Sequence, residues 1–100
     1  MTARHDTAFV IGPDHPALPG HFPGRPVVPG VVLLDRVMAA AREAFGLGPA
    51  IGLPRAKFAA PVMPGQRVDA ALTRLDATRI AFACSVEGHG VASGELRFAP

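Results

Sequence analysis

The sequence predicts an α+β fold in which a curved antiparallel sheet of about five strands wraps around one long central helix. Residues 30–45 contain a run of helix-forming alanines and end at a Gly-Leu-Gly-Pro stop. The four segments that follow are short and are separated by turn residues, and 66–75 and 79–87 alternate between apolar and polar residues, whereas 51–58 alternates irregularly. One strand-like segment precedes the helix, so a sheet packed on a single helix is the favoured arrangement.

The N-terminal half contains a strand, a long loop and the helix. The strand covers 7–12, and the proline-rich loop covers 14–29 without a periodic pattern. Loops of this length in compact domains are usually functional or disordered, and the apolar residues in this one favour a packed loop. The helix starts at Gly30 with a run, 31–34, that is apolar on every side, which is typical of a core helix.

The C-terminal half is predicted to form four strands, at 51–58, 66–75, 79–87 and 91–98, with a hairpin turn at 88–90. Such a sheet has open edges and leaves one flank of the helix uncovered. A 100-residue chain buries a limited share of its surface, yet 49% of these residues are hydrophobic. We therefore expect one domain over 1–100, with a flexible segment at 1–6, and a homo-oligomer that is at least a dimer.

Composition excludes several classes of function. The net charge is +2, the basic residues are scattered, and Trp and Tyr are absent, so a nucleic-acid partner is not expected. Cys84 is the only cysteine, so the chain has no disulfide of its own and a reducing compartment is indicated. No apolar run is long enough for a signal peptide or a membrane span, which favours a cytoplasmic protein without a membrane partner. The histidines and Cys84 lack metal-ligand spacing, so neither a metal nor a cofactor is expected.

The segment between His21 and Asp35 concentrates residues that can do chemistry. Prolines stiffen the loop around His21, and a rigidly held imidazole can act as a base near neutral pH. Asp35 stands beside Leu33 and Leu34, where burial would favour its neutral, proton-donating form. Gly30 opens the helix, whose free N–H groups can polarise a carbonyl oxygen.

Taken together, these residues suit the elimination of water from a β-hydroxy carbonyl compound. His21 would remove the α proton, Asp35 would protonate the departing hydroxyl, and the N–H of Gly30 would hold the carbonyl. Each residue alone also has a structural explanation: a solvated loop histidine, a salt-bridged acid, a helix-capping glycine. Their spacing is what favours catalysis.

The stretch 20–31, Gly-His-Phe-Pro-Gly-Arg-Pro-Val-Val-Pro-Gly-Val, resembles the hot-dog-fold 3-hydroxyacyl-[acyl-carrier-protein] dehydratases of fatty acid synthesis, the FabZ/FabA type. Lys57-Phe58 followed by 61–65 is similar to the next strand and turn of that family, and the resemblance extends over 7–98. The chain is similar to the short stand-alone members, which resemble those of aryl-polyene or other polyketide-like gene clusters.

The resemblance implies an enzyme that converts a (3R)-hydroxyacyl thioester to a trans-2-enoyl thioester. It implies that His21 and Asp35 are the catalytic pair, contributed by opposite protomers of a dimer. Gly30 would give its N–H to the thioester carbonyl, and the carbonyl of Val27 would accept a hydrogen bond from the histidine ring. The family has an acyl tunnel along the helix and an acidic acyl carrier protein as partner, which Arg25 would suit. We expect a substrate-binding set of Phe22, Val27, Pro29, Gly30 and Val31.

Two other functions remain open on the sequence alone. A hot-dog acyl thioesterase would need water or a carboxylate at the thioester carbonyl, which the spacing of His21 and Asp35 does not favour. A non-catalytic acyl-binding or accessory subunit of a heterodimer would need neither residue. The products of a 3-hydroxyacyl thioester distinguish the three: an enoyl thioester, a free thiol, or neither.

Overall fold

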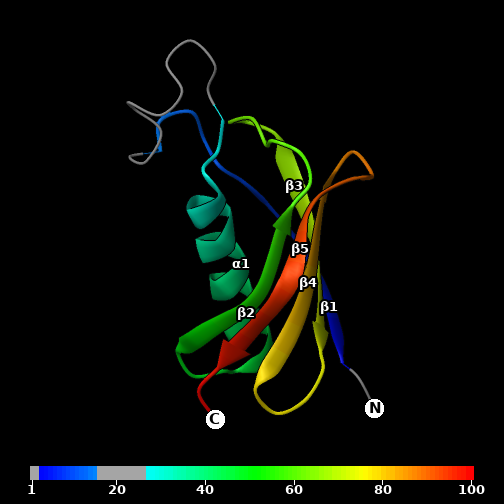
Figure 1. The fold of residues 1–100 in the computed structure, drawn as a ribbon. Helices are drawn as coiled ribbons and strands as arrows, with labels where there is room; N and C mark the ends of the chain where they lie inside the picture. Colours follow the sequence, from blue (N-terminus) through cyan, green and yellow to red (C-terminus); the bar gives the residue numbers. More distant parts are fainter. Residues whose placement is uncertain (1–2, 16–26) are drawn as a thin grey trace.

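The computed structural model describes residues 3–15 and 27–100, and its fold confirms the predicted α+β class (Figure 1). Five strands and one helix occur in the described residues. In chain order they are β1 (Arg4–Val10), α1 (Gly30–Phe45), β2 (Ala50–Phe58), β3 (Arg67–Arg74), β4 (Arg79–Val86) and β5 (His89–Phe98). The helix has the predicted bounds, and the strands after it differ from the predicted ranges by one or two residues.

The five strands form one antiparallel sheet in the order β1-β3-β4-β5-β2. Helix α1 lies across one face of this sheet (Figure 1). Strands β1 and β2, which lie far apart in the sequence, form the two edges, so the sheet is open. The end of β2 reaches the start of α1, where Phe58 lies beside Gly30.

The core lies between α1 and the inner face of the sheet. The helix contributes Val32, Leu33, Val37 and Ala41, and alternate residues of the central strands face them. These strand residues are Val68, Ala70, Leu72, Ile80, Phe82, Cys84, Leu96 and Phe98. Burial raises the pKa of the Cys84 thiol to about 11, so Cys84 is a neutral core residue.

Both ends of α1 are set by residues with special backbone properties. Pro29 is the N-cap, and no side chain caps the first turn. Gly46 ends the helix in the left-handed conformation, with φ of 63°, and its N–H donates to the carbonyl of Arg42. In the middle, Arg36 lies over the ring of Phe9 at 5.0 Å and donates to the carbonyl of Val10 at 3.3 Å. Arg36 therefore ties α1 to the end of β1.

Two local predictions were wrong. Residues 4–6, expected to be flexible, are the first residues of β1 and pair with residues 71–73 of β3, because the alternating pattern of β3 offers them a complete ladder. The last hairpin turns at Glu87 and Gly88, with φ of 51° and 81°, so His89 and Gly90 belong to β5. Two successive residues with positive φ give a two-residue turn that matches the right-handed twist of the strands. The Gly-His-Gly pattern had predicted this turn one residue too late.

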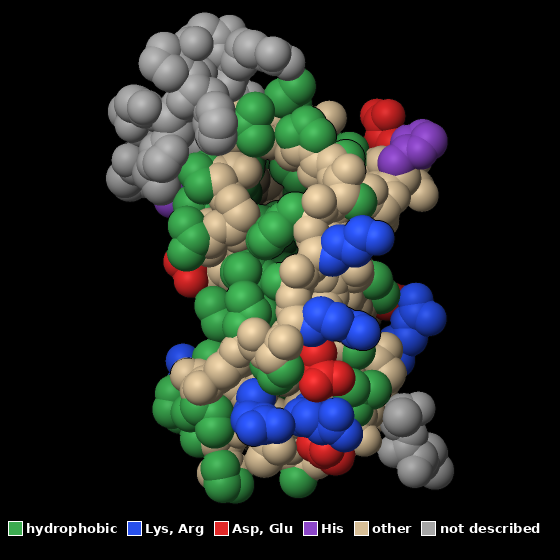
Figure 2. Space-filling model, in the orientation of Figure 1, with side chains coloured by type: hydrophobic (Ala, Val, Ile, Leu, Met, Phe, Trp, Pro, Cys, Tyr) green, Lys and Arg blue, Asp and Glu red, His purple; other side chains and the backbone are tan. Residues whose placement is uncertain are grey.

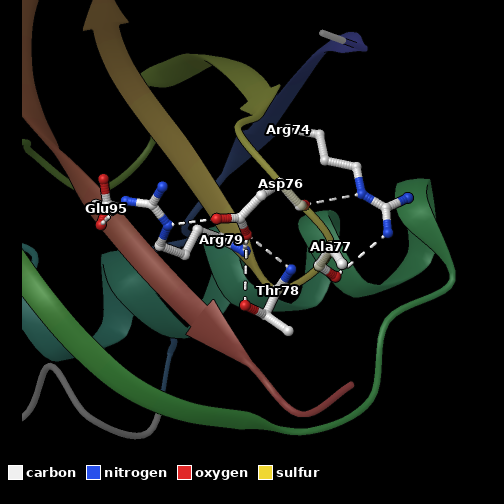
Figure 3. A network of polar contacts seen from close by, with 6 residues as sticks. All are labelled: Arg74, Asp76, Ala77, Thr78, Arg79 and Glu95. Carbon is white, nitrogen blue, oxygen red and sulfur yellow. Dashed lines mark hydrogen bonds and ion pairs between the residues drawn. The ribbon is translucent and has the colours of Figure 1, made fainter. Parts of the chain in front are cut away.

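The turn between β3 and β4 is held by the carboxylate of Asp76 (Figure 3). It accepts hydrogen bonds from the N–H groups of Thr78 at 2.9 Å and Arg79 at 2.8 Å, and from Nε of Arg79 at 2.7 Å. The N–H of Thr78 and the Arg79 guanidinium together hold the pKa of Asp76 at about 2. Arg74 donates to the carbonyls of Asp76 and Ala77, so the turn presents its cations in fixed positions.

Strand β2 approaches β5 unusually closely at one point. The register between them shifts on both sides of Gly52, and beyond that shift Ala56 pairs with Gly94. A Cβ on Gly94 would overlap the carbonyl oxygen of Arg55 and lie 2.9 Å from Cα of Ala56. Gly94 therefore lets β2 bend around the edge of the sheet toward α1.

We expect Gly94→Ala to destabilise the protein by about 1–3 kcal/mol, because the new methyl would meet backbone atoms that cannot move independently. Urea unfolding followed by circular dichroism measures the change. Gly90→Ala is the matched control on the same strand, since its Cβ would meet nothing within 4 Å, and it should change stability by less than about 0.5 kcal/mol. Equal stability of the two variants would contradict the close approach of β2.

Candidate active site at the start of the helix

An open pocket of about 500 Å³ lies at the N-terminus of α1. One wall is the chain that enters the helix, from Val27 to Gly30 with Leu33, and the other is the segment 58–62 at the end of β2. A hydrogen bond from the N–H of Val28 to the carbonyl of Val62, 2.7 Å long, joins the two walls. The lining is almost wholly apolar, which suits a hydrocarbon chain.

The first turn of α1 presents backbone donors at this pocket. The N–H groups of Val32 and Leu33 both donate to the carbonyl of Pro29, at 3.0 and 3.2 Å. Among the residues that the structure describes, the N–H groups of Gly30 and Val31 have no acceptor. The positive end of the helix dipole adds to these donors, so the position can hold an oxygen that carries partial negative charge.

Phe58 closes the side of Gly30. An ideal Cβ on Gly30 would lie 2.8 Å from Cζ of Phe58 and 3.0 Å from its Cε1. A glycine is therefore needed at position 30 for the ring to remain where it is. Half of the surface of Phe58 is exposed, because the ring lies at the mouth of the pocket.

The predicted site residues divide into three groups. Val27, Pro29 and Gly30 lie together in the pocket lining. Val31 and Asp35 do not line it, because they lie on the flank of α1 that faces away from the sheet. His21 and Phe22, like Arg25, fall outside the described residues, so the separation of His21 and Asp35 stays a prediction.

The expected burial of Asp35 was wrong for the single chain. Asp35 is exposed, and so are Val31 and Ala39, one turn before and after it. The apolar run at the start of the helix is thus not enclosed on all sides. A helix packed on one sheet buries one flank, and positions four residues apart on the other flank stay uncovered.

The uncovered flank continues into an apolar surface along β2. Val31 is 65% exposed, and β2 and the segment after it carry further large exposed hydrophobic residues, Ile51, Leu53, Phe58 and Met63. Figure 2 shows hydrophobic side chains gathered over α1 and beside β2. Together with the unpaired edge of β2, this apolar surface is suited to association with a second protein chain.

A basic surface lies on the opposite face of the sheet, formed by Arg55, Lys57, Arg79 and Arg97. Strand pairing places Arg55 beside Glu95 and places Arg97 directly opposite Arg79, with all of these side chains on the outer face. Arg79 pairs with Asp76 and, at 3.5 Å, with Glu95. Within 3–15 and 27–100, no acidic group forms an ion pair with Arg55, Lys57 or Arg97.

Sequence reasoning missed the far wall of the pocket. Phe58 and Val62 lie about 30 positions after Gly30, and no local pattern connects them to it. The one available signal was the family-like motif at 57–65, and Phe58, Pro61 and Val62 of this motif line the pocket. No group of three metal-binding side chains occurs among the described residues, and no helix there is long and apolar enough to cross a membrane.

The curved sheet around one helix is the hot-dog fold, and comparison with known proteins identifies the family within this fold. The family model described as ApeI-like, ApeI dehydratase, matches residues 2–95. The 3-hydroxyacyl-[acyl-carrier-protein] dehydratase FabZ of Ruminiclostridium cellulolyticum is 31% identical over 89% of this chain and 71% of the relative. FabZ of Thermus thermophilus is 34% identical over 85% of this chain and 69% of the relative. The chain belongs to the ApeI-like dehydratase family, related to FabZ, as the motif at 20–31 predicted.

Solved structures confirm the fold. An uncharacterized protein from Erwinia carotovora subsp. atroseptica superposes with a TM-score of 0.85 at 28% identity, over 99% of this chain and 85% of that one. The dehydratase heterocomplex ApeI:P from Xenorhabdus doucetiae gives a TM-score of 0.82 at 23% identity, over 97% of this chain and 88% of that one. A fluoroacetyl-CoA-specific thioesterase, FlK, gives 0.71 at 18% identity, over 97% and 84%. At the last two identities the likeness concerns the fold alone.

Proposed function

We propose that this chain is a (3R)-hydroxyacyl-[acyl-carrier-protein] dehydratase that forms a trans-2-enoyl thioester. The observation that carries the proposal is the apolar pocket at the start of α1, whose lining includes Gly30 with an N–H group that has no acceptor among the described residues. A thioester carbonyl oxygen accepts hydrogen bonds there while the acyl chain lies against Val28, Leu33 and Val62. Membership of a dehydratase family supports the same reaction.

The proposed reaction moves one proton at each end of the bond that forms. His21 removes a proton from C2 of the substrate, and the electron pair becomes the C2=C3 double bond. The C3–O bond breaks, and Asp35 gives its proton to the departing hydroxyl, which leaves as water. The N–H of Gly30 stabilises the negative charge that develops on the thioester oxygen, which makes the C2 proton more acidic.

The proposed site is completed by a second chain. Asp35 is exposed on the uncovered flank of α1, in an apolar stripe that water would otherwise solvate. A second copy packed on this flank and on the edge of β2 would bury that stripe and bring its own catalytic loop toward Asp35.

The two alternatives remain weaker on the same observations. A thioesterase shares the fold, as the FlK neighbour does, but needs a water or carboxylate at the thioester carbonyl, which the spacing of His21 and Asp35 does not favour. An accessory subunit is favoured by one comparison, since the ApeI:P neighbour is a heterocomplex. The intact pair of His21 and Asp35 favours an active subunit over a silent one.

We expect His21→Ala and Asp35→Asn each to lower the rate of dehydration by about 10²–10⁴-fold, because each removes one proton transfer. The rate is measured by mass spectrometry as loss of water from a 3-hydroxyacyl carrier protein, with free thiol followed in parallel. Size-exclusion chromatography serves as the control for folding and assembly. Turnover close to wild type in either variant refutes its role, and thiol release without enoyl product identifies a thioesterase.

Mixing the two inactive variants should restore activity to about one quarter of the wild-type value, since statistical exchange makes half of the dimers hybrid and each hybrid retains one intact site. Subunit exchange is verified by native mass spectrometry of differently tagged chains. Verified hybrids without activity would show that the two residues act within one chain. Activity only with a different subunit added would instead support the accessory role.

We also propose that the basic surface is where the acidic carrier protein docks. Arg55, Lys57 and Arg97 lack acidic partners in the described chain, and Arg97 faces Arg79 directly. Like charges opposite each other in a sheet are destabilising, so an anionic partner would relieve this repulsion. Lys57 precedes Phe58 at the pocket mouth, which connects the surface to the site. In the orientation of Figure 2, Lys and Arg side chains gather over the strands with acidic side chains between them.

Charge reversal by Arg55→Glu with Arg97→Glu should lower kcat/KM for the carrier-bound substrate by about tenfold or more at low salt. A short 3-hydroxyacyl thioester without a carrier should be turned over as before, since it does not use the basic surface. The paired variant Arg67→Glu with Arg4→Glu, on β3 and β1, makes the same change in net charge and is the matched control. An equal loss with both substrates would place the effect in folding or catalysis and contradict docking.

A further inference from the structure

We propose that Gln66 is a positioning residue for the N–H group of Gly30, the group that binds the thioester oxygen in the proposed function. This inference rests on the proposed function for the identity of the ligand. The geometry that carries it is a continuous path of hydrogen bonds from the side chain of Gln66 to Val28, two residues before Gly30.

The path starts in a tight turn at 63–66, Met-Pro-Gly-Gln, which Gln66 closes with two hydrogen bonds to Met63. The N–H of Gln66 donates to the carbonyl of Met63 at 3.2 Å. The side-chain oxygen Oε1 of Gln66 accepts a hydrogen bond from the N–H of Met63 at 2.8 Å. Pro64 in the second position and Gly65 in the third, with φ of 88°, are typical of a type II turn. Gln66 therefore holds both backbone polar groups of Met63.

The bond to the N–H of Met63 fixes a peptide group that also binds the chain before the helix. The N–H of Met63 and the carbonyl of Val62 belong to one planar trans peptide, so they point in opposite directions. The carbonyl of Val62 accepts the hydrogen bond from the N–H of Val28 at 2.7 Å. Without Oε1 of Gln66, this peptide loses the partner on its other side and can rotate away from Val28.

The position of Val28 is passed on to the start of α1. Val28 and Val62 are both buried, so the hydrogen bond between them is costly to lose. Pro29 follows with a φ of −59° that its ring keeps fixed, and Gly30 is the next residue. Because no side chain caps α1, the bond of Val28 supports the entry to the helix from outside.

The same turn binds the chain that leaves β1. The N–H of Gly65 donates to the carbonyl of Ile11 at 2.8 Å, and Ile11 is fully buried. In the sequence, residues 12–27 lie between Ile11 and Val28, and His21 is among them. One turn therefore binds the chain on both sides of the stretch that contains the proposed base, in addition to supporting Gly30.

Loss of this support should affect the transition state more than the bound substrate. The negative charge on the thioester oxygen is largest in the transition state, so a displaced N–H of Gly30 loses most of its effect there. The expected signature is a lower kcat with little change in KM. Gln66 touches neither the substrate nor the reacting atoms in this role, and it acts only through Val62 and Val28.

Kinetics of the full chain with a 3-hydroxybutyryl group on its carrier protein test this role. Gln66→Ala should lower kcat by about tenfold or more and change KM by less than about threefold. Gln66→Glu keeps an oxygen that accepts from the N–H of Met63, so its kcat should stay within about threefold of wild type. Unchanged kcat in Gln66→Ala, or an equal loss in both variants, overturns the inference.

A pair of glycine variants separates positioning from a general loss of stability. Gly65 and Gly88 have φ of 88° and 81°, and a Cβ on either would meet nothing within 4 Å. Replacement by alanine therefore strains both turns in the same way, and we expect similar shifts of the urea midpoint. Only Gly65→Ala should lower kcat by about tenfold, since Gly88 lies in the hairpin between β4 and β5. An equal kcat loss in both variants, or none in Gly65→Ala, contradicts the role of the turn.

Amide hydrogen exchange followed by NMR tests the same role without turnover. The N–H of Val28 should exchange about tenfold or more faster in Gln66→Ala than in wild type, beyond any change at the buried Leu72, which reports on global stability. If the wild-type protein dehydrates no substrate, the proposed reaction fails, and the exchange at Val28 still decides the role of Gln66. An exchange rate of Val28 that changes no more than that of Leu72 overturns the inference.

Discussion

The burial of one flank of α1 against the inner face of the sheet is the constraint on which the rest of the structure depends. Val32, Leu33, Val37 and Ala41 supply that flank, and the alternating residues of β3, β4 and β5 receive it. A single helix that packs on a single sheet can bury only one of its flanks in this way. The other side, with Val31 and Asp35, is left for association, and the proposed acid is therefore found where a second chain would cover it.

The same packing produces the pocket. Because α1 begins at Gly30 without a side-chain cap, its first N–H groups have no acceptor among the described residues, at the point where β2 ends. Gly94 allows the backbone of β2 to lie close to β5, and the chain after β2 continues to Val62, whose carbonyl accepts a hydrogen bond from the N–H of Val28. Two departures from regular structure thus contribute to one site: the first turn of α1 lacks a side-chain cap, and Gly94 lacks a Cβ where β2 lies close to β5.

The two faces of the sheet carry different kinds of surface. The buried side chains of the inner face are apolar, while the outer face near β2 and β5 carries Arg55, Lys57 and Arg97 around Glu95. The turn at Asp76 holds Arg79 in place beside them (Figure 3). An acidic partner on the outer face and an acyl group on the inner face would meet at the end of β2, where Lys57 and Phe58 are neighbours.

Local sequence patterns were sufficient to predict the helix, the strands after it and the family. The alternation in β3 to β5, the alanines of α1 and its glycine stop are properties of neighbouring residues, and so is the dense motif that contains His21 and Gly30. The contact of Phe58 with Gly30, the exposure of Asp35 and the cluster of Arg55 with Arg97 followed only from the fold. Each joins residues from different strands, or depends on which flank of a helix meets a sheet, and a one-dimensional pattern contains neither strand order nor the direction in which an edge strand bends.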